Sequence, residues 1–158
     1  MKHVEIRKAS PSDAPEIASV LAESFAEYKS LYTAKAYAAT TPNSDAIRKR
    51  FAEGATWVAE LEEKIVGTVS VVPEDESLYI RSMAILPAAR GNRIGERLLA
   101  VIEDFAVANG YRRLFLSTTP FLHRAIRLYE NFGFKRSDEA PNELYGTPLV
   151  TMSKELSC

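Results

Sequence analysis

The sequence predicts a single α/β domain in which helices flank a mixed, mostly antiparallel sheet. Three observations lead to this fold class: a length of 158 residues, β-rich runs joined by short turns in the first half, and alternating strand and helix patterns in the second half. Short turns join antiparallel neighbours, whereas β-α-β crossovers join parallel ones. A chain of this length suits one domain, which we expect to cover residues 1–158.

The composition is that of an ordinary globular protein, with 46% apolar and 26% charged residues. A domain of this size buries about 68–70% of the surface of its unfolded chain, so it needs neither disulfides nor metals for stability. The net charge of −1 argues against a nucleic-acid partner or an anionic membrane. His3 and His123 lack metal-ligand spacing, so we expect two surface histidines and no metal.

The only cysteine is Cys158, which suits a reducing compartment. The first residues lack the apolar segment of a signal peptide, and no apolar stretch approaches the roughly 18–20 residues that span a bilayer. We therefore expect a cytoplasmic protein that does not enter a membrane. The sequence leaves the assembly open between a monomer and a homodimer.

The first 55 residues predict one strand followed by helices. Residues 3–8 alternate apolar and polar side chains, as a half-buried strand does. A helix is expected to start at residues 12–13, with an apolar face that includes Phe25. Residues 27–41 are rich in tyrosine and alanine, and residues 45–53 favour a short helix. Its charged run, Arg48-Lys49-Arg50, is expected to form a solvated face.

The middle of the chain predicts a hairpin and a third strand. The β-rich runs at residues 56–60 and 65–72 are separated by only four residues. An acidic turn is expected at residues 73–76, and a strand follows over residues 78–86 until Pro87 ends it.

The second half predicts alternating helices and strands. The clearest helix covers residues 94–109, with Gly110 at its C-terminal end. A short buried strand is expected at residues 114–117 and an amphipathic helix at residues 121–132. Final strands are expected at residues 134–136 and 148–153.

The loop between the strand at residues 78–86 and the strongest helix has the features of an anion site. The first N–H groups of a helix lack intrahelical partners and lie at the positive end of its dipole. Arg90 and Arg93 add charged donors, Gly91 allows a turn, and Gly95 would let a bulky anion approach the first turn. The residues of a P-loop are absent, and two glycines do not make a dinucleotide fingerprint.

The run PAARGNRIGERLLAVIEDFA, followed by LYENFGF, resembles the GNAT superfamily of N-acetyltransferases. The signature of that family, Arg/Gln-x-x-Gly-x-Gly/Ala, opens the helix after the fourth strand. The predicted element order is similar to the family along nearly the whole chain. The resemblance implies a GNAT-type fold, acetyl-CoA as cosubstrate and direct acetyl transfer to a primary amine of a small molecule, peptide or protein.

The resemblance also implies which residues hold acetyl-CoA. Backbone groups of the fourth strand would meet the pantetheine arm and stabilise the charge that develops on the acyl oxygen. The loop and first helical turn would hold the pyrophosphate. Arg93 stands where the family has its first signature glycine, and we expect it in the first helical turn with negative φ and its guanidinium free to reach the 3′-phosphate of coenzyme A. The cofactor-binding residues so implied are Met83, Ala84, Ile85, Arg90, Gly91, Asn92, Arg93, Ile94, Gly95 and Glu96.

Tyr129 of LYENFGF is the expected general acid. In similar proteins this tyrosine directs its hydroxyl at the cofactor sulfur, and a neutral phenol can protonate a departing thiolate. The alternative is that Tyr129 only packs within the apolar stripe of its helix. Leu122 stands where relatives often have an asparagine that contacts the cofactor, which departs from the pattern.

The general base is not marked by a motif. Relatives frequently have a glutamate on the fourth strand, where this chain has Tyr79, and Glu76 is the nearest carboxylate upstream. Glu76 is either the general base or only a solvated residue of the acidic turn. A chain of water molecules could remove the proton in place of either residue.

The sequence leaves open which residues form the acceptor site and which of several functions the fold performs. Phe25, Tyr28, Tyr32 and Tyr37 fall where the family builds its acceptor wall, but core packing explains them equally well. A non-catalytic acyl-CoA sensor on the same fold is one rival, since fold does not fix function. An acyltransferase for longer chains is another, although bulky Met83 and Leu122 favour a short acyl group.

Overall fold

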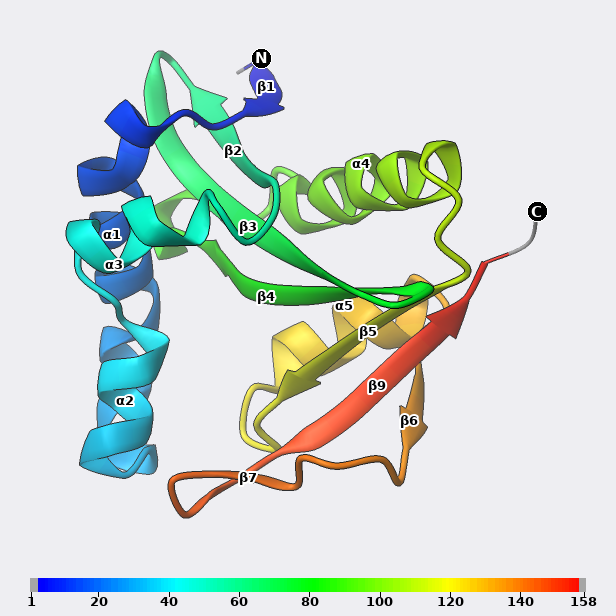
Figure 1. The fold of residues 1–158 in the computed structure, drawn as a ribbon. Helices are drawn as coiled ribbons and strands as arrows, with labels where there is room; N and C mark the ends of the chain where they lie inside the picture. The colour runs from blue at the N-terminus through cyan, green and yellow to red at the C-terminus, as the bar shows by residue number, and fades with distance from the viewer. Residues whose placement is uncertain (1–2, 157–158) are drawn as a thin grey trace.

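The computed structural model describes residues 3–156 (Figure 1), so Cys158 lies outside the described residues. The first strand and the helical region after it comprise β1 (Val4–Lys8), η1 (Pro11–Asp13), α1 (Ala14–Phe25), η2 (Ala26–Leu31), α2 (Ala34–Thr40) and α3 (Ser44–Arg50). The central strands and the longest helix are β2 (Thr56–Leu61), β3 (Lys64–Glu74), β4 (Ser77–Ile85), η3 (Pro87–Ala89) and α4 (Ile94–Ala108). The last part comprises β5 (Arg113–Thr118), α5 (His123–Asn131), β6 (Lys135–Ser137), β7 (Glu143–Leu144), β8 (Thr147–Pro148) and β9 (Val150–Glu155).

Seven strands form the main sheet, in the order β1-β2-β3-β4-β5-β9-β6. The pair β4–β5 is parallel, and the other five neighbouring pairs are antiparallel. The prediction of a mixed, mostly antiparallel sheet flanked by helices is therefore confirmed. Strands β7 and β8 form a separate two-stranded hairpin.

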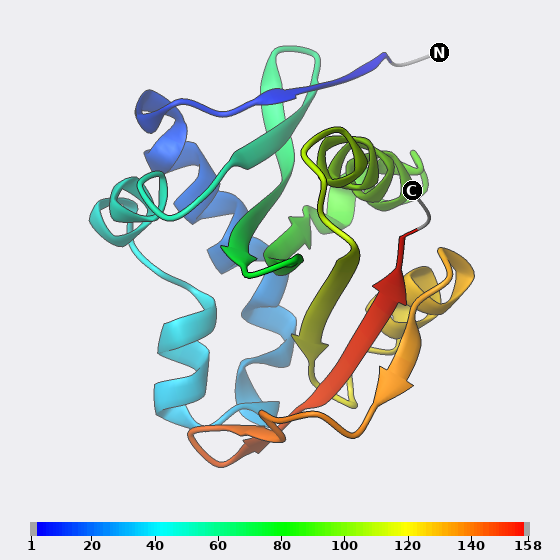
Figure 2. The same cartoon turned by 45° about the vertical axis from the view of Figure 1, so that its right-hand side comes forward.

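Helices α1 and α4 both pack on β3 and β4, and Figure 2 shows them on opposite sides of this part of the sheet. The apolar stripe of α4 supplies fully buried side chains, among them Leu98, Leu99 and Ile102. Burial of a leucine or isoleucine contributes about 1.5–3 kcal/mol, so this stripe fixes α4 on the sheet. Within residues 3–156, no helix is long and apolar enough to cross a membrane.

Some expected boundaries differ from the structure. The tyrosine-rich residues 27–41 form η2 and α2, two short helices without a long apolar face. Strand β3 continues through Pro73 to Glu74, so the expected acidic turn shrinks to Asp75 and Glu76. Pro73 is tolerated there because β2 pairs with β3 only as far as Ser70, so no β2 ladder needs its N–H.

Strands β4 and β5 separate before they end, which leaves a gap in the sheet. The two strands pair from Ser77 opposite Arg113 to Ile80 opposite Leu116, and not beyond. Just after this point β4 contains a bulge at Ser82, whose φ of 57° is left-handed. Residues 81–85 therefore have β3 on one side and no strand partner among the described residues on the other.

Candidate active site

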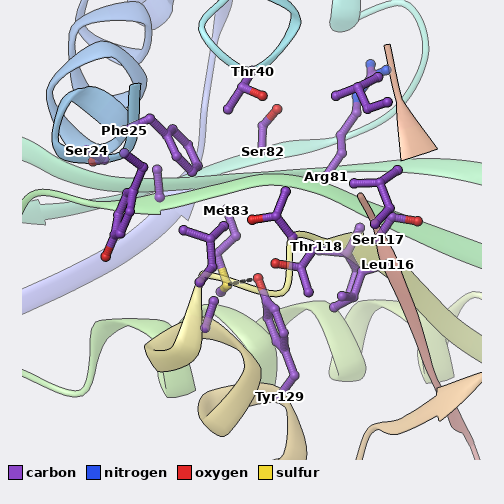
Figure 3. Close-up of a pocket in the computed structure, with 18 of the residues that line it drawn as sticks. Ser24, Phe25, Thr40, Arg81, Ser82, Met83, Leu116, Ser117, Thr118 and Tyr129 are labelled. Atoms are coloured by element: carbon purple, nitrogen blue, oxygen red, sulfur yellow. Dashed lines mark hydrogen bonds between the residues drawn. The ribbon is translucent and has the colours of Figure 1, made fainter. Parts of the chain in front are cut away.

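A cavity of about 380 Å³ opens where β4 and β5 separate. Figure 3 shows the hydroxyl of Tyr129 in contact with the sulfur of Met83, with Ser24 and Phe25 to one side and Arg81 to the other. The walls of the cavity come from seven regions: α1 with η2, the α2–α3 region, β4, the loop before α4, β5, α5 and the β7–β8 segment. Of the cofactor residues implied by the resemblance, Met83, Ala84, Ile85 and Arg90 line it.

Tyr129 extends from α5 into this cavity. Its side chain is 6% exposed, and its Oη donates a hydrogen bond to Sδ of Met83 at 3.7 Å. Because a thioether is a weak acceptor, the hydroxyl keeps most of its donor capacity for a ligand. Burial raises the pKa of Tyr129 well above its ordinary value, with smaller contributions from Tyr79 and Tyr32. Tyr129 is therefore a proton donor throughout the neutral range.

The loop before α4 has an unusual backbone. Gly91 has a φ of 91° and Arg93 a φ of 57°, so two residues of the loop are left-handed. Nδ2 of Asn92 donates to the carbonyl of Ala89 at 2.8 Å and braces the turn. The helix begins at Ile94 without a side-chain cap, which leaves the N–H groups of its first turn available to an anion.

The expectation for Arg93 was wrong in two respects. Arg93 is the N-cap of α4 rather than a residue of its first turn, and its φ is positive rather than negative. Its guanidinium is not free, because it forms an ion pair with Glu96 at 2.9 Å. The left-handed conformation explains why glycine suits this position in the family, since a side chain adds strain there.

The role expected for Gly95 also needs correction. Gly95 is buried, and a Cβ built on it would lie 2.7 Å from Cδ2 of Leu128 and 3.2 Å from Cδ1 of Ile85. Its missing side chain therefore allows α4 to approach α5 and β4 closely. The sequence led us to expect that Gly95 opens the helix start to an anion, but the space beside its Cα is filled by Leu128 and Ile85.

The two candidate bases lie in different places. Tyr79 lines the cavity, packs on Phe115 at a centroid distance of 5.0 Å, and has a raised pKa because it is buried. Glu76 is exposed in the β3–β4 turn, where its carbonyl accepts the N–H of Arg112 at 2.8 Å. The structure does not bring Glu76 to the cavity.

Aromatic side chains form the wall opposite α5. Phe25, Tyr28 and Tyr32 line the cavity, whereas Tyr37 packs behind Tyr32 at 6.0 Å between ring centroids. Tyr32 also meets Phe121 of the β5–α5 loop edge-on at 5.0 Å. This contact joins η2 to the segment that leads into α5 and closes the cavity on that side.

Four arginines line the cavity in roles that differ from those expected from the sequence. Arg50 was expected on a solvated face, but it is half-buried and its Nη1 donates to Oγ of Ser82 at 2.6 Å. Arg81 and Arg124 were not singled out, while Arg90 was expected only as a cofactor ligand and also binds Glu27 at 2.5 Å. Arg81 had one visible signal, a cation within the otherwise apolar run LYIRSMAI.

All the charged side chains among the described lining residues of the cavity are positive. Four arginines line it, and the described lining residues include no aspartate, glutamate, lysine or histidine. Among residues 3–156 there is also no group of three or more histidine, cysteine, aspartate or glutamate side chains that could hold a metal ion.

The arrangement fits an acyl-CoA. The free edge of β4 at residues 81–85 offers backbone groups to an extended amide-containing chain. The uncapped start of α4 lies just beyond that edge and suits phosphate oxygens. The hydroxyl of Tyr129 contacts Met83 of this edge, in the same cavity that Phe25, Tyr28 and Tyr32 line.

Comparison with known proteins agrees with this geometry. The family model described as the acetyltransferase (GNAT) family matches residues 17–134. The chain is 34% identical over 141 residues to the uncharacterized N-acetyltransferase YjgM of Escherichia coli (strain K12), which covers 85% of this chain and 84% of that one. It is 37% identical over 84 residues to the probable N-acetyltransferase camello of Xenopus laevis, covering 51% of this chain and only 38% of that relative.

Solved structures show the same fold at low sequence identity. The PaiA N-acetyltransferase from Thermoplasma acidophilum, in complex with coenzyme A, has a TM-score of 0.84 at 18% identity, covering 98% of this chain and 99% of that one. The yncA protein from Salmonella typhimurium, with its cofactor acetyl-CoA, has a TM-score of 0.74 at 21% identity, covering 98% and 94%. With the sequence match over residues 17–134, these likenesses lead to one conclusion: the chain belongs to the GNAT acetyltransferase family.

Proposed function

We propose that this protein transfers an acetyl group from acetyl-CoA directly to a primary amine, with Tyr129 as the general acid. The observation that carries the proposal is the buried hydroxyl of Tyr129, placed in the gap where β4 and β5 separate. Acetyl-CoA supplies an activated thioester, so that the new C–N bond forms as the C–S bond breaks. The proton of the Tyr129 hydroxyl neutralises the departing sulfur.

Three parts of the chain would hold acetyl-CoA. Backbone groups of Met83, Ala84 and Ile85 would bind the pantetheine amides, as an added strand binds a sheet edge. The N–H groups of Ile94, Gly95 and Glu96, with the loop Arg90–Gly91–Asn92–Arg93, would bind the pyrophosphate. The bulky side chains of Met83 and Leu122 in the lining support an acetyl group over longer chains.

The proton of the acceptor amine would leave through water. No carboxylate or imidazole lies among the described lining residues, and the raised pKa of Tyr79 keeps its phenol protonated. Nearby cations favour the neutral form of an amine, so the four arginines of the lining promote the attacking species. Glu76 is exposed in the β3–β4 turn and is not a lining residue, so its position does not support a role as the base. The single cysteine supports a cytoplasmic location.

Thiol release tests the proposal. We would add acetyl-CoA and a library of primary amines to the purified chain and follow free thiol, with Tyr129→Phe as the matched control. Binding should be seen separately as thermal stabilisation, by about 2.7 kcal/mol at a hundredfold excess over Kd. Amine-dependent thiol release is the expected result. Stabilisation by acetyl-CoA without release for any amine would instead identify an acyl-CoA sensor, and faster release from longer acyl-CoAs would identify a longer-chain acyltransferase.

A further inference from the structure

Two guanidinium groups reach the same end of the cavity from different elements. Arg50 is the last residue of α3 and Arg81 lies on β4, and both line the cavity. Nη1 of Arg50 donates to Oγ of Ser82 at 2.6 Å, which places it beside the bulge that follows Arg81. The only charged partner of Arg81 in the described chain is Glu53, through Nη2.

The negative charge at this end does not balance the two cations. No carboxylate of residues 3–156 lies within ion-pair distance of Arg50. Nε of Arg81 is buried and has no hydrogen-bond partner in the described part of the chain. Burial lowers the pKa of Arg50, and the charge of Arg81 lowers it further. Two guanidinium groups that share one carboxylate partner leave a net positive charge at this end of the cavity, which favours an anionic ligand.

The position along β4 separates this anion from the phosphates of acetyl-CoA. The pyrophosphate loop follows Ile85, at the C-terminal end of β4, whereas Arg81 lies on the other side of Met83. Arg90 and Arg124 are the cavity cations near that loop, since both act on Glu27. Arg50 and Arg81 are therefore left for the second substrate.

The spacing limits the size of that substrate. Arg81 precedes Met83 by two residues with the bulge at Ser82 between them, so their Cα atoms are separated by at most about 7 Å. Met83 marks the transfer point, because Oη of Tyr129 contacts its sulfur. An amine at the transfer point and an anion at the two arginines are thus separated by a few bonds, as in a small amino acid.

We propose that the acceptor is an amine that carries a carboxylate, and that Arg50 and Arg81 hold this carboxylate while Tyr129 faces the reacting end. This proposal rests on the proposed N-acetyltransferase function and names the substrate class of the same site. The planar fork of a guanidinium binds carboxylates bidentately, and two such groups select an acid against its uncharged analogue.

The experiment compares free L-amino acids with their carboxamides as acceptors, in the parent and in Arg50→Gln. The parent should prefer the acids, measured as the ratio of kcat/KM for each acid to that for its carboxamide. In Arg50→Gln this ratio should fall roughly 10- to 100-fold, the range for a lost hydrogen bond to a charged group. Arg48→Gln is the matched control, because Arg48 is exposed on the same helix and pairs only with Asp45 there. That variant should keep the parent ratio.

A binding measurement keeps the two proposals apart. N-acetyl-L-amino acids and their carboxamides would be titrated by calorimetry into the coenzyme A complexes of the parent, Arg50→Gln and Arg81→Gln. Tighter binding of the acids by the parent, weakened in both variants, supports the carboxylate site even if no acceptor releases thiol, in which case only the proposed catalysis fails. Equal binding of acids and carboxamides by the parent, or an equal loss of both in the variants, would overturn the inference.

Discussion

The part of the molecule that would hold acetyl-CoA and the part that would hold the acceptor are built in different ways. The cofactor half is continuous in sequence: β4, the loop, α4, β5 and α5 follow one another. The acceptor half combines η2, α2 and α3 with the β7–β8 hairpin, more than 90 residues later in the chain (Figure 2). The first would bind its ligand through backbone groups at one strand edge and one helix start, whereas the second would use side chains brought together only by folding. A local backbone site leaves a motif in the sequence, whereas a composite side-chain site does not.

The largest effect should come from the residue at which the two halves meet. Tyr129→Phe should lower kcat about 10²-fold, since it removes a positioned general acid, and should leave the Kd of acetyl-CoA nearly unchanged. Single-turnover kinetics with calorimetry checks both quantities. Tyr79→Phe, on the β4 wall of the same cavity, is a suitable control and should have a smaller effect. Equal single-turnover rates in Tyr129→Phe and the parent would return Tyr129 to a packing role.

The pH profile gives an independent readout of Tyr129. Burial raises its pKa, so the phenol stays protonated beyond the ordinary value near 10. We expect kcat/KM to rise with pH as the acceptor amine loses its proton, and to show no fall between about pH 8 and 10. A fall in that window that vanishes in Tyr129→Phe would mean that the phenol ionises there.

The next effect tests the packing of the cofactor half. Gly95→Ala should lower the free energy of unfolding by about 1–3 kcal/mol, because its Cβ would overlap Leu128 at 2.7 Å. Weaker acetyl-CoA binding should follow if α4 shifts. Denaturant unfolding of Gly95→Ala, Leu128→Ala and the double variant gives the coupling energy. Leu128→Ala makes room for the methyl group, so the double variant should lose less stability than the two single losses added together; strict additivity would contradict the packing role.

The acceptor half depends on a smaller contact. Thr33 caps α2 through the N–H of Ala36 at 3.2 Å, and its hydroxyl donates to the carbonyl of Tyr145 in the β7–β8 turn at 2.8 Å. Thr33→Val should cost about 1 kcal/mol of stability through the lost cap. The KM of the acceptor should rise a few-fold while the Kd of acetyl-CoA stays constant, because the hairpin belongs to the proposed acceptor half. Thr33→Ser, which keeps the hydroxyl, should behave as the parent. An equal rise in the KM of the acceptor and in the Kd of acetyl-CoA would show that the two halves are not separable.

The same contrast decides what could be predicted from the sequence. The sheet class, α4 and the placement of Tyr129 in a pocket follow from hydrophobic period and a family motif, which are local properties. The role of Arg50 could not be predicted, because its run Arg48-Lys49-Arg50 has the pattern of a solvated face. In the structure, Arg50 donates a hydrogen bond to Ser82, whose bulged backbone the sequence does not reveal. Gly95 was assigned to ligand approach because its partner, Leu128, lies 33 residues away in sequence.

The smallest effect concerns Arg93, where this chain departs from the family pattern. Its φ of 57° costs about 1–2 kcal/mol for a residue with a Cβ. Glycine removes that strain but adds about 0.5–1 kcal/mol of unfolded-state entropy. The ion pair with Glu96 is exposed, with 79% of the Arg93 side chain accessible, and its loss costs only a few tenths of a kcal/mol. Arg93→Gly should therefore stabilise the fold slightly, by about 0.5 kcal/mol, which denaturant unfolding can detect.

The same substitution tests whether Arg93 recognises the 3′-phosphate of coenzyme A. The guanidinium is bound to Glu96 in the structure, so a contact to the phosphate must replace an existing ion pair rather than add one. The gain from such an exchange at an exposed site is small, because solvent screens both partners alike. Calorimetry of the parent and Arg93→Gly with coenzyme A and 3′-dephospho-coenzyme A, at fixed ionic strength, gives the coupling energy directly. We expect a coupling of no more than about 0.5 kcal/mol. A coupling above about 1.5 kcal/mol, typical of a hydrogen bond to a charged group, would show that Arg93 leaves Glu96 for the phosphate when the cofactor binds.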